Sequence, residues 1–260
     1  MACPYCSGSE VSSSGDGWKA ICGRAELALR HEPDNSFDAI VTDPPYGTGA
    51  NSLLGRLQAS SSKYQNSNAK NRLPDIAGDS MLPESWKFMM QSVVAECYRV
   101  AKPGADVLSF CDWRSLSSFL DVYGAAGFQL KSVLPWNKGR GCRPHKNGFR
   151  SQSELIIWAR KGGKLDRPGD PVYLDGVFTF PTRSVRKQHL TEKPLELMAA
   201  LLRVVPAGGR VLDPFHGSGT TGVAALQAGL TYLGIEQTTH YHATAVERLQ
   251  AALPAASAVA

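Results

Sequence analysis

The stretch covering residues 210–236 restricts the possible folds of this chain more than any other. It reads as a short apolar strand that ends in Asp213, a glycine-bearing loop, a helix over about 220–228, and a second apolar strand over 231–235 that ends in Glu236. Strands that alternate with helices in this way are typical of a parallel sheet covered by helices. We therefore predict an α/β fold with a doubly wound sheet.

The loop of this unit, DPFHGSGTTG, is typical of a nucleotide site. Gly217 and Gly219 allow a ligand to approach the backbone, and the free N–H groups of the following helix point toward an anionic group. Glu236 stands where a nucleotide-binding unit places the acid that holds ribose hydroxyls. By itself the unit fits a nicotinamide cofactor, a flavin or S-adenosylmethionine, and a glycine turn without a ligand is the alternative.

The remainder of the chain continues the alternation of strands and helices. Prolines and glycines separate the expected elements, and no sequence repeat is present. Strands are expected over residues 18–22, 37–42, 106–111, 128–136 and 154–159, a small β-like stretch over 172–180, and helices over about 24–30, 83–100, 116–126, 195–205 and from about 238 to 253.

A second motif, AIVTDPPYGT over residues 39–48, ends an apolar strand in a stiff polar loop. The two prolines lack N–H groups, so Asp43 and the carbonyl of Pro44 form a cluster of acceptors with few local donors. Tyr46 adds a flat ring beside them, which suits a planar base that carries an exocyclic amine. We therefore expect a ligand that brings N–H groups, with a simple turn as the alternative.

Basic residues are concentrated in the middle of the chain. The net formal charge is +5, yet residues 131–164 contain nine Lys and Arg against a single acid, Glu154. Trp136, His145 and Phe149 alternate with these charges, which favours contact with nucleic acid over a merely solvated face.

The composition is that of a soluble globular protein. No apolar run approaches the roughly 20 residues that span a bilayer, and the first residues lack the blocks of a signal peptide, so we expect a cytoplasmic location, in a bacterium or from a phage, and no membrane partner. Cys3 and Cys6 have the spacing of half a zinc site, but two reduced thiols in a tail is the favoured interpretation, and no metal is predicted.

In its order of motifs the chain resembles the amino-methylating (N6-adenine or N4-cytosine) DNA methyltransferases of the β class, in which the catalytic motif precedes the cofactor motif. The resemblance extends from Lys19 to about Leu253. It implies a Rossmann-like sheet that uses S-adenosylmethionine, with a short inserted DNA-recognition region. It rests on six segments in the family's order: VTDPPYG, ECYRVAKPGADVLSF, VLPWNKG, SELIIWARKG, HLTEKPLELM and VLDPFHGSGTTGVAALQAGLTYLGIE.

For the catalytic motif, Asp43, Pro44, Pro45 and Tyr46, the resemblance implies that Asp43 and the Pro44 carbonyl bind the target amino group while Tyr46 stacks on a flipped base. Two acceptors on the amine hydrogens direct its lone pair toward the sulfonium methyl. The expected target is N6 of adenine in double-stranded DNA. N4 of cytosine stays open, as do methylation of RNA or a protein amide and, in a different class, a DNA-binding module without catalysis.

For the cofactor, the resemblance places Glu236 on the ribose and Lys193 near the carboxylate of the methionine part. One departure concerns the adenine side, where the family usually has Gly-Asp and this chain has Gly23 and Arg24, so that either Glu26 substitutes or the contact is absent. The implied cofactor-binding residues are Asp213, Phe215, Gly217, Ser218, Gly219, Thr220, Glu236, Thr191 and Lys193.

DNA recognition is expected in the basic stretch, with phosphate contacts favoured over base readout. A homodimer and a companion restriction endonuclease are further expectations from the resemblance. The expected DNA-binding residues are Lys138, Arg140, Arg143, Lys146 and Arg150. The expected organisation is a flexible tail over 1–17, one methyltransferase domain over 18–253 and a tail over 254–260, the domain holding a mobile loop over 48–80, DNA-recognition excursions over 138–190 and a cofactor-binding part over 191–253.

Overall fold

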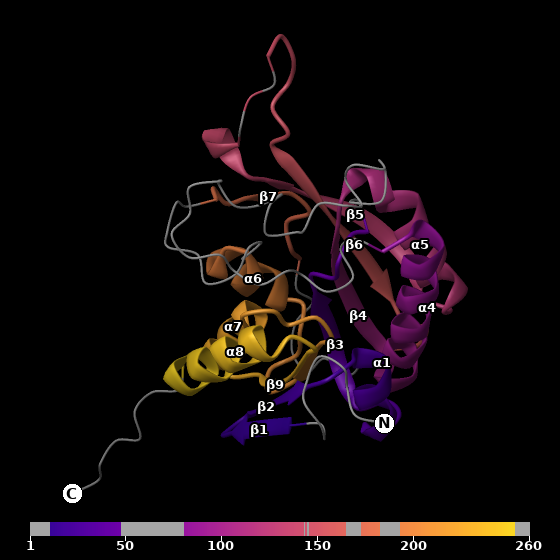
Figure 1. Cartoon of the computed structure of the whole chain (residues 1–260), viewed down its shortest axis with the longest axis vertical. Coiled ribbons are helices and arrows are strands. Elements are labelled where there is room, and N and C mark those ends of the chain that lie inside the picture. Colours follow the sequence, from indigo (N-terminus) through magenta and orange to yellow (C-terminus); the bar gives the residue numbers. More distant parts are fainter. Residues whose placement is uncertain are drawn as a thin grey trace, which may run out of the picture.

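The computed structural model describes residues 11–47, 81–142, 144, 146–164, 173–182 and 193–252. Within these ranges nine strands form one mixed sheet in the order β1-β2-β9-β8-β3-β4-β6-β5-β7 (Figure 1). The strands are β1 Val11–Gly15, β2 Trp18–Cys22, β3 Phe37–Thr42, β4 Ala101–Cys111, β5 Gln129–Asn137, β6 Ser153–Arg160, β7 Phe178–Thr179, β8 Arg210–Asp213 and β9 Thr231–Glu236.

The five central strands β2, β9, β8, β3 and β4 run parallel to one another. On one side β1 is antiparallel to β2, and on the other β6 is antiparallel to both β4 and β5. Because the polar motifs follow β3, β8 and β9, the parallel arrangement brings them to the same edge of the sheet.

Helices cover both faces of the sheet. In Figure 1, α4 and α5 lie to the right of the sheet and α6, α7 and α8 to the left, and the two hydrophobic cores divide in the same way. This arrangement confirms the predicted doubly wound α/β fold. The helices are α1 Ala25–Ala28, α4 Pro83–Val100, α5 Leu116–Ala125, α6 Leu195–Leu202, α7 Thr220–Gln227 and α8 Thr239–Ala252, with short 3₁₀ turns η1 Leu29–His31, η3 Trp113–Ser115 and η4 Gly139–Gly141.

Helix α4 illustrates how the sequence pattern positions the core. Pro83 occupies its first turn, where the missing N–H costs nothing, and the buried side chains recur every three or four residues. Trp86, Met90, Val93, Val94, Cys97 and Val100 all face the sheet.

Two parts of the predicted organisation are wrong. Residues 11–15, expected in a flexible tail, form β1, because their backbone groups pair with β2 in a regular antiparallel ladder. Of the β-like stretch expected over 172–180, the described part, residues 173–180, contains only β7, two residues that pair with β5.

The basic stretch is also not one continuous excursion. Strand β6 runs back across the sheet, so that Arg160 ends at the edge opposite Asp43, where it makes two hydrogen bonds to the buried Asp106. Lys161 donates to the carbonyl of Ala101 at that same edge. The two charges therefore stabilise the sheet. Residues 1–10, 48–80, 165–172, 183–192 and 253–260 lie outside the described residues, and the tails, loop and excursions expected there stay predictions.

Of the helices in the described ranges, none is both long and apolar enough to cross a membrane.

Candidate active site

The predicted catalytic loop begins where β3 ends, at the carboxyl edge of the parallel strands. Two neighbouring elements hold it by its carbonyl groups. The indole Nε1 of Trp86 donates to the carbonyl of Pro45 at 2.6 Å, and the hydroxyl of Ser115 donates to the carbonyl of Tyr46 at 2.9 Å. Among the described residues, none donates a hydrogen bond to the carbonyl of Pro44, so that this acceptor is available to a ligand.

Gly47 ends the loop with a left-handed backbone, φ 63°. A Cβ atom at this position would lie 2.9 Å from the ring of Trp86. A side chain here would therefore displace the indole that holds Pro45.

Four polar side chains meet at this loop. Asp43 and Tyr46 belong to the sequence motif, and Glu154 and Lys193 come from other parts of the chain. The ammonium of Lys193 lies 2.5 Å from Asp43 Oδ2 and 3.0 Å from Glu154 Oε1. The hydroxyl of Tyr46 lies 2.5 Å from Asp43 Oδ1 and 2.7 Å from Glu154 Oε1. The phenol and the ammonium each bridge the two carboxylates, and we call these four residues the acceptor cluster.

Burial and charge set the protonation of the acceptor cluster. Burial raises the pKa of the Asp43 carboxyl, and the nearby charge of Glu154 adds to this effect, while Lys193 opposes it. Burial also tends to raise the pKa of Glu154, but the charges of Lys193 and Lys138 outweigh it, so that this pKa is lowered. The two carboxylates raise the pKa of Lys193 despite its burial. Lys193 is therefore a charged group at neutral pH.

The sequence analysis expected Lys193 near the cofactor carboxylate, and the structure places its ammonium on the catalytic motif. Glu154 was noted only as the single acid of the basic stretch. Its position next to the start of β6, which pairs with β5 and β4, brings it to the same edge as Asp43. An isolated acid in a basic run was the only signal in the sequence that could have singled it out.

A hydrogen bond links the end of β3, directly before Asp43, to the start of the predicted cofactor loop. The hydroxyl of Thr42, the last residue of β3, donates to Asp213 Oδ1 at 2.7 Å, and the backbone N–H of Phe215 donates to the same oxygen at 3.1 Å. Burial raises the pKa of the Asp213 carboxyl to about 7, which these donors only partly counteract. Thr42 was not identified from the sequence, because a threonine in a buried strand is common.

The glycine loop after β8 has the backbone that the sequence requires. Gly217 and Gly219 have positive φ angles of 50° and 80°, and Gly219 immediately precedes α7. The N–H of Gly217 donates to Glu236 Oε2 at 3.2 Å, which joins the loop to the end of β9. Asp213, Gly217, Gly219 and Glu236 therefore lie together at one edge of the sheet, and their role in binding a cofactor stays a prediction.

Arg248 on α8 is a further residue that the sequence analysis missed. Its Nη1 donates to the carbonyl of Ser218 at 2.9 Å, to the hydroxyl of Ser218 at 2.9 Å, and to the hydroxyl of Thr220 at 3.1 Å. These contacts hold the glycine loop against α8. Ser218 and Thr220 are buried by this packing.

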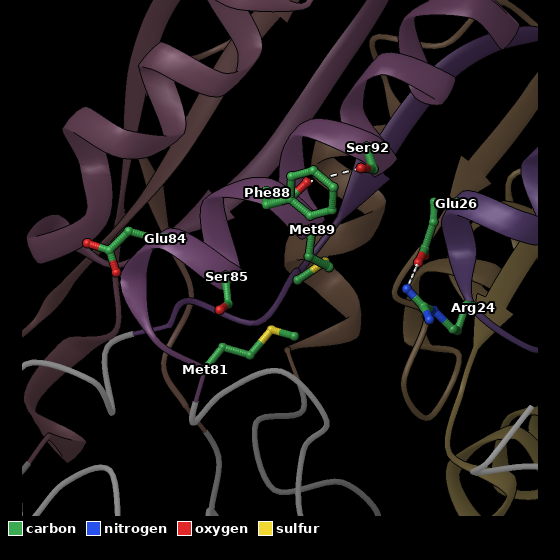
Figure 2. A pocket seen from close by; sticks show the side chains of 8 residues that line it. All are labelled: Arg24, Glu26, Met81, Glu84, Ser85, Phe88, Met89 and Ser92. Atoms are coloured by element: carbon green, nitrogen blue, oxygen red, sulfur yellow. Dashed lines mark hydrogen bonds and ion pairs between the residues drawn. The ribbon is translucent and has the colours of Figure 1, made fainter.

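A cavity of about 430 Å³ opens between α1 and α4 (Figure 2). It lies near Glu236, because the N–H of Gly23, directly before Arg24, donates to the Glu236 carbonyl. On one side Arg24 forms an ion pair with Glu26, and on the other Met81, Phe88 and Met89 offer apolar surface (Figure 2). Arg24, which stands where the family usually has an acid, therefore lines this cavity.

The predicted DNA-binding residues lie on or near the connection between β5 and β6, which extends from the top of the body in Figure 1. Arg140, Lys146 and Arg150 are exposed, and the guanidinium of Arg150 donates to the carbonyls of Arg140 and Cys142, so that it shapes the connection. Lys138 instead faces Glu154 at 3.5 Å. Arg143 and Thr191 lie outside the described residues, and in the part of the chain that is described no group of three potential ligands could hold a metal ion.

Comparison with known proteins gives consistent results. The sequence model of one family, N6_N4_Mtase, described as DNA methylase, matches residues 37–247. The Escherichia coli (strain K12) protein "Putative methylase YubD" is 33% identical over 220 residues, which cover 84% of each protein. Type II methyltransferase M2.MboI from Moraxella bovis is 27% identical over 229 residues, 80% of this chain and 79% of that protein. The crystal structure of the M1.HpyAVI–SAM complex superposes with a TM-score of 0.64 at 23% identity, covering 89% of this chain and 98% of the other, which shows a shared fold.

Proposed function

The chain belongs to the DNA methylase family of N6 and N4 amino-methyltransferases, and from this premise we propose that it transfers a methyl group from S-adenosylmethionine to N6 of a flipped adenine in double-stranded DNA. Adenine is favoured over N4 of cytosine only by a family tendency, since cytosine-N4 members more often carry Ser where this chain has Asp43, so cytosine is the second candidate.

The observation that carries the proposal is the arrangement of acceptors at the end of β3. Asp43 and the carbonyl of Pro44 are adjacent, the Pro44 carbonyl accepts no hydrogen bond from the described residues, and the ring of Tyr46 stands beside them. An exocyclic amine delocalises its lone pair into the base and is a poor nucleophile. Two acceptors on its hydrogens direct that lone pair out of the ring plane, toward an electrophile.

Stacking on Tyr46 supports a base taken out of the duplex. Extrusion of a base costs a few kcal/mol, and stacking on an aromatic ring returns about 1–3 kcal/mol. Tyr46 contacts Phe119 edge to face at 6.4 Å between ring centroids, which limits the directions in which its ring can turn. The loop thus holds a preformed face for a base.

The residues of the glycine loop fit S-adenosylmethionine. The positive φ angles of Gly217 and Gly219 let a ligand approach the backbone, and the Glu236 carboxylate at the end of β9 suits ribose hydroxyls. The half-buried carboxylates of Asp43 and Glu154 share one ammonium, that of Lys193, and the negative charge that remains makes this edge suitable for a cation such as a sulfonium. The cofactor supplies an electrophilic methyl group. The hydrogen bond from Thr42 to Asp213 fixes the distance between the glycine loop and the acceptors at Asp43 and Pro44.

We assign the adenine end of the cofactor to the cavity between α1 and α4. The chain enters this cavity's wall at Arg24, directly after Gly23, whose N–H donates to the Glu236 carbonyl. The cavity combines the apolar side chains Phe88 and Met89 with the carboxylate of Glu26 (Figure 2). A planar heterocycle needs this combination of flat apolar contact and a few polar partners. Arg24 then lies beside the adenine, where the family usually has an acid.

The exposed basic residues between β5 and β6 are proposed to contact DNA phosphates. Arg140 and Lys146 are exposed on a connection that extends from the domain, as Figure 1 shows. A cytoplasmic location, a companion restriction endonuclease and a homodimer are further proposals, the endonuclease supported by similarity to a relative named a type II methyltransferase.

The proposal is tested by incubating the protein with S-adenosylmethionine labelled in its methyl group and with double-stranded DNA, followed by nucleoside analysis by mass spectrometry. We expect N6-methyladenine. N4-methylcytosine would establish the second candidate, and DNA binding without any transferred label would refute the enzyme and favour a DNA-binding module.

Asp43→Ala is expected to lower transfer by roughly 100-fold or more, because one of the two amine acceptors is lost. Cofactor affinity is expected to stay within about threefold, since the hydrogen bonds of the Asp43 side chain to described residues are all within the acceptor cluster. The matched control is Asp121→Ala, which removes an exposed acid on α5 and is expected to leave the rate unchanged. Retained turnover in Asp43→Ala would contradict the proposed role.

A further inference from the structure

The acceptor cluster contains an apparent contradiction. Asp43 must offer a carboxylate oxygen to the target amine, yet the ammonium of Lys193 already lies 2.5 Å from its Oδ2. Lys193 is also buried, with a side chain only 8% exposed, so that water screens this ion pair little. A fixed lysine at this position would cancel the negative charge that is needed opposite an amine on which positive charge develops.

Glu154 offers Lys193 a second partner at close range. Its Oε1 lies 3.0 Å from the ammonium, and its Oε2 faces Lys138 at 3.5 Å. The ammonium also lies 4.8 Å from the centre of the ring of Phe110, which belongs to β4. A small displacement of the ammonium toward Glu154 can therefore keep it paired within the same buried space.

Tyr46 connects the same two carboxylates. Its single phenolic proton stands between Asp43 Oδ1 at 2.5 Å and Glu154 Oε1 at 2.7 Å, and it can be donated fully to only one of them. The two carboxylates thus compete for one phenol and one ammonium. A target amine adds two further N–H donors on the side of Asp43.

We propose that Lys193 is an exchangeable donor, which holds Asp43 in the absence of DNA and moves onto Glu154 when the amino group of the target base takes its place. This inference rests on the proposed function. It makes Glu154 and Lys193 positioning residues for methyl transfer.

The exchange replaces one N–H donor of Asp43 by another, so that the buried carboxylate is never without a partner. It also releases the charge of Asp43 for the reaction, because the charge of Glu154 balances that of Lys193. The cluster itself, two carboxylates and one ammonium, carries one net negative charge, and the ammonium of Lys138 lies outside it, 3.5 Å from the far oxygen of Glu154. Without Glu154, the remaining pair would be neutral, and Lys193 would have Asp43 as its only carboxylate in the cluster.

The test compares three variants, Glu154→Gln, Lys193→Met and the double variant, with the wild type. Single-turnover methyl transfer to duplex DNA is measured at saturating labelled S-adenosylmethionine, together with KM for DNA, equilibrium cofactor binding and urea midpoints. Glu247→Gln is the matched control, because Glu247 is exposed on α8, away from the acceptor cluster.

Glu154→Gln keeps a side chain of the same shape and loses its charge, so that Lys193 stays on Asp43. We expect the transfer rate to fall by roughly 100-fold, with KM for DNA and cofactor affinity changed by less than about threefold. Adding Lys193→Met to this variant frees Asp43 and is expected to restore the rate by roughly tenfold. A purely structural contact between the two residues predicts no such recovery.

A normal transfer rate in Glu154→Gln would overturn the exchange, and so would a double variant that is as slow as Glu154→Gln or slower. A loss of cofactor affinity in Lys193→Met would also overturn it, because it would place Lys193 on the cofactor carboxylate. Urea midpoints identify a variant that has failed to fold, and in that case Glu154→Asp, which keeps the charge, must retain more activity than Glu154→Gln. The wild type distinguishes failure of the proposed function from failure of the exchange. If the wild type transfers no methyl group, the proposed function is wrong. If the wild type is active but Lys193→Met does not restore the rate of Glu154→Gln, only the exchange is wrong.

Discussion

Asp213→Asn is expected to remove a pH-dependent loss of stability. Asp213 is 2% exposed and has no cationic partner among its described contacts. Its carboxylate accepts from the side chains of Thr42 and Thr221 and from the backbone N–H of Phe215. The pKa of its carboxyl rises from 3.8 to about 7, with burial as the main cause. An asparagine has nearly the same shape and keeps the oxygen acceptor, without a charge to bury.

The sign and size follow from proton linkage. Below about pH 4 the carboxyl is protonated in both the folded and the unfolded chain. Between about pH 4 and pH 7 the unfolded chain releases the proton while the folded chain retains it, so that the free energy of unfolding falls as the pH rises. The rise of the pKa from 3.8 to about 7, at roughly 1.36 kcal/mol for each tenfold change in the acid dissociation constant, gives a total loss of about 4 kcal/mol, complete above pH 7.

The assay is urea unfolding of the wild type and of Asp213→Asn, without cofactor, at about pH 4.5 and pH 8.5. Other titrating groups contribute equally to both proteins and cancel in the difference. By the same linkage relation, the wild type is expected to lose about 3 kcal/mol relative to the variant between these two pH values. A difference that changes by less than about 0.5 kcal/mol would refute the burial of an ionisable carboxyl as the cause.

Two further substitutions test the packing behind the site. Gly234→Ala would place a Cβ atom 2.4 Å from His216 Nδ1 and 2.8 Å from the Tyr232 hydroxyl. We expect the free energy of unfolding in urea to fall by about 1–3 kcal/mol, and calorimetry to show weaker cofactor binding. The control is Gly124→Ala, whose Cβ would have nothing within 4 Å and which is expected to be neutral or stabilising. Asp106→Ala removes the buried acceptor of Trp158 and Arg160, at 2.7 and 2.8 Å, and is expected to lower the free energy of unfolding by about 3–5 kcal/mol; a loss no larger than that of the exposed Asp121→Ala would show that this pair does not stabilise the sheet.

The fold was predictable because its signals are local. Alternation of apolar strands with helices, Pro83 at the start of α4, and the glycines beside α7 each specify a short element without reference to the rest of the chain. Strand β1 was not predicted because its sequence, VSSSG, is polar and lacks a strand pattern. The strand forms through its pairing with β2. Edge strands with little burial have weak patterns of their own.

The sequence by itself determined which segments are proposed to carry the chemistry: the acceptors at Asp43 and Pro44, the ring of Tyr46, the glycine loop after Asp213, and Glu236 at the end of β9. Their meeting at one edge could be inferred, because the carboxyl ends of parallel strands coincide. Only the tertiary structure decided which side chains complete them. Glu154 lies at the edge that holds Asp43 because β6 is antiparallel to β4. Lys193, 150 residues from Asp43, contacts both acids, and no local sequence pattern indicates these contacts. Such contacts depend on strand order and direction, which are properties of the whole sheet and not of any one segment.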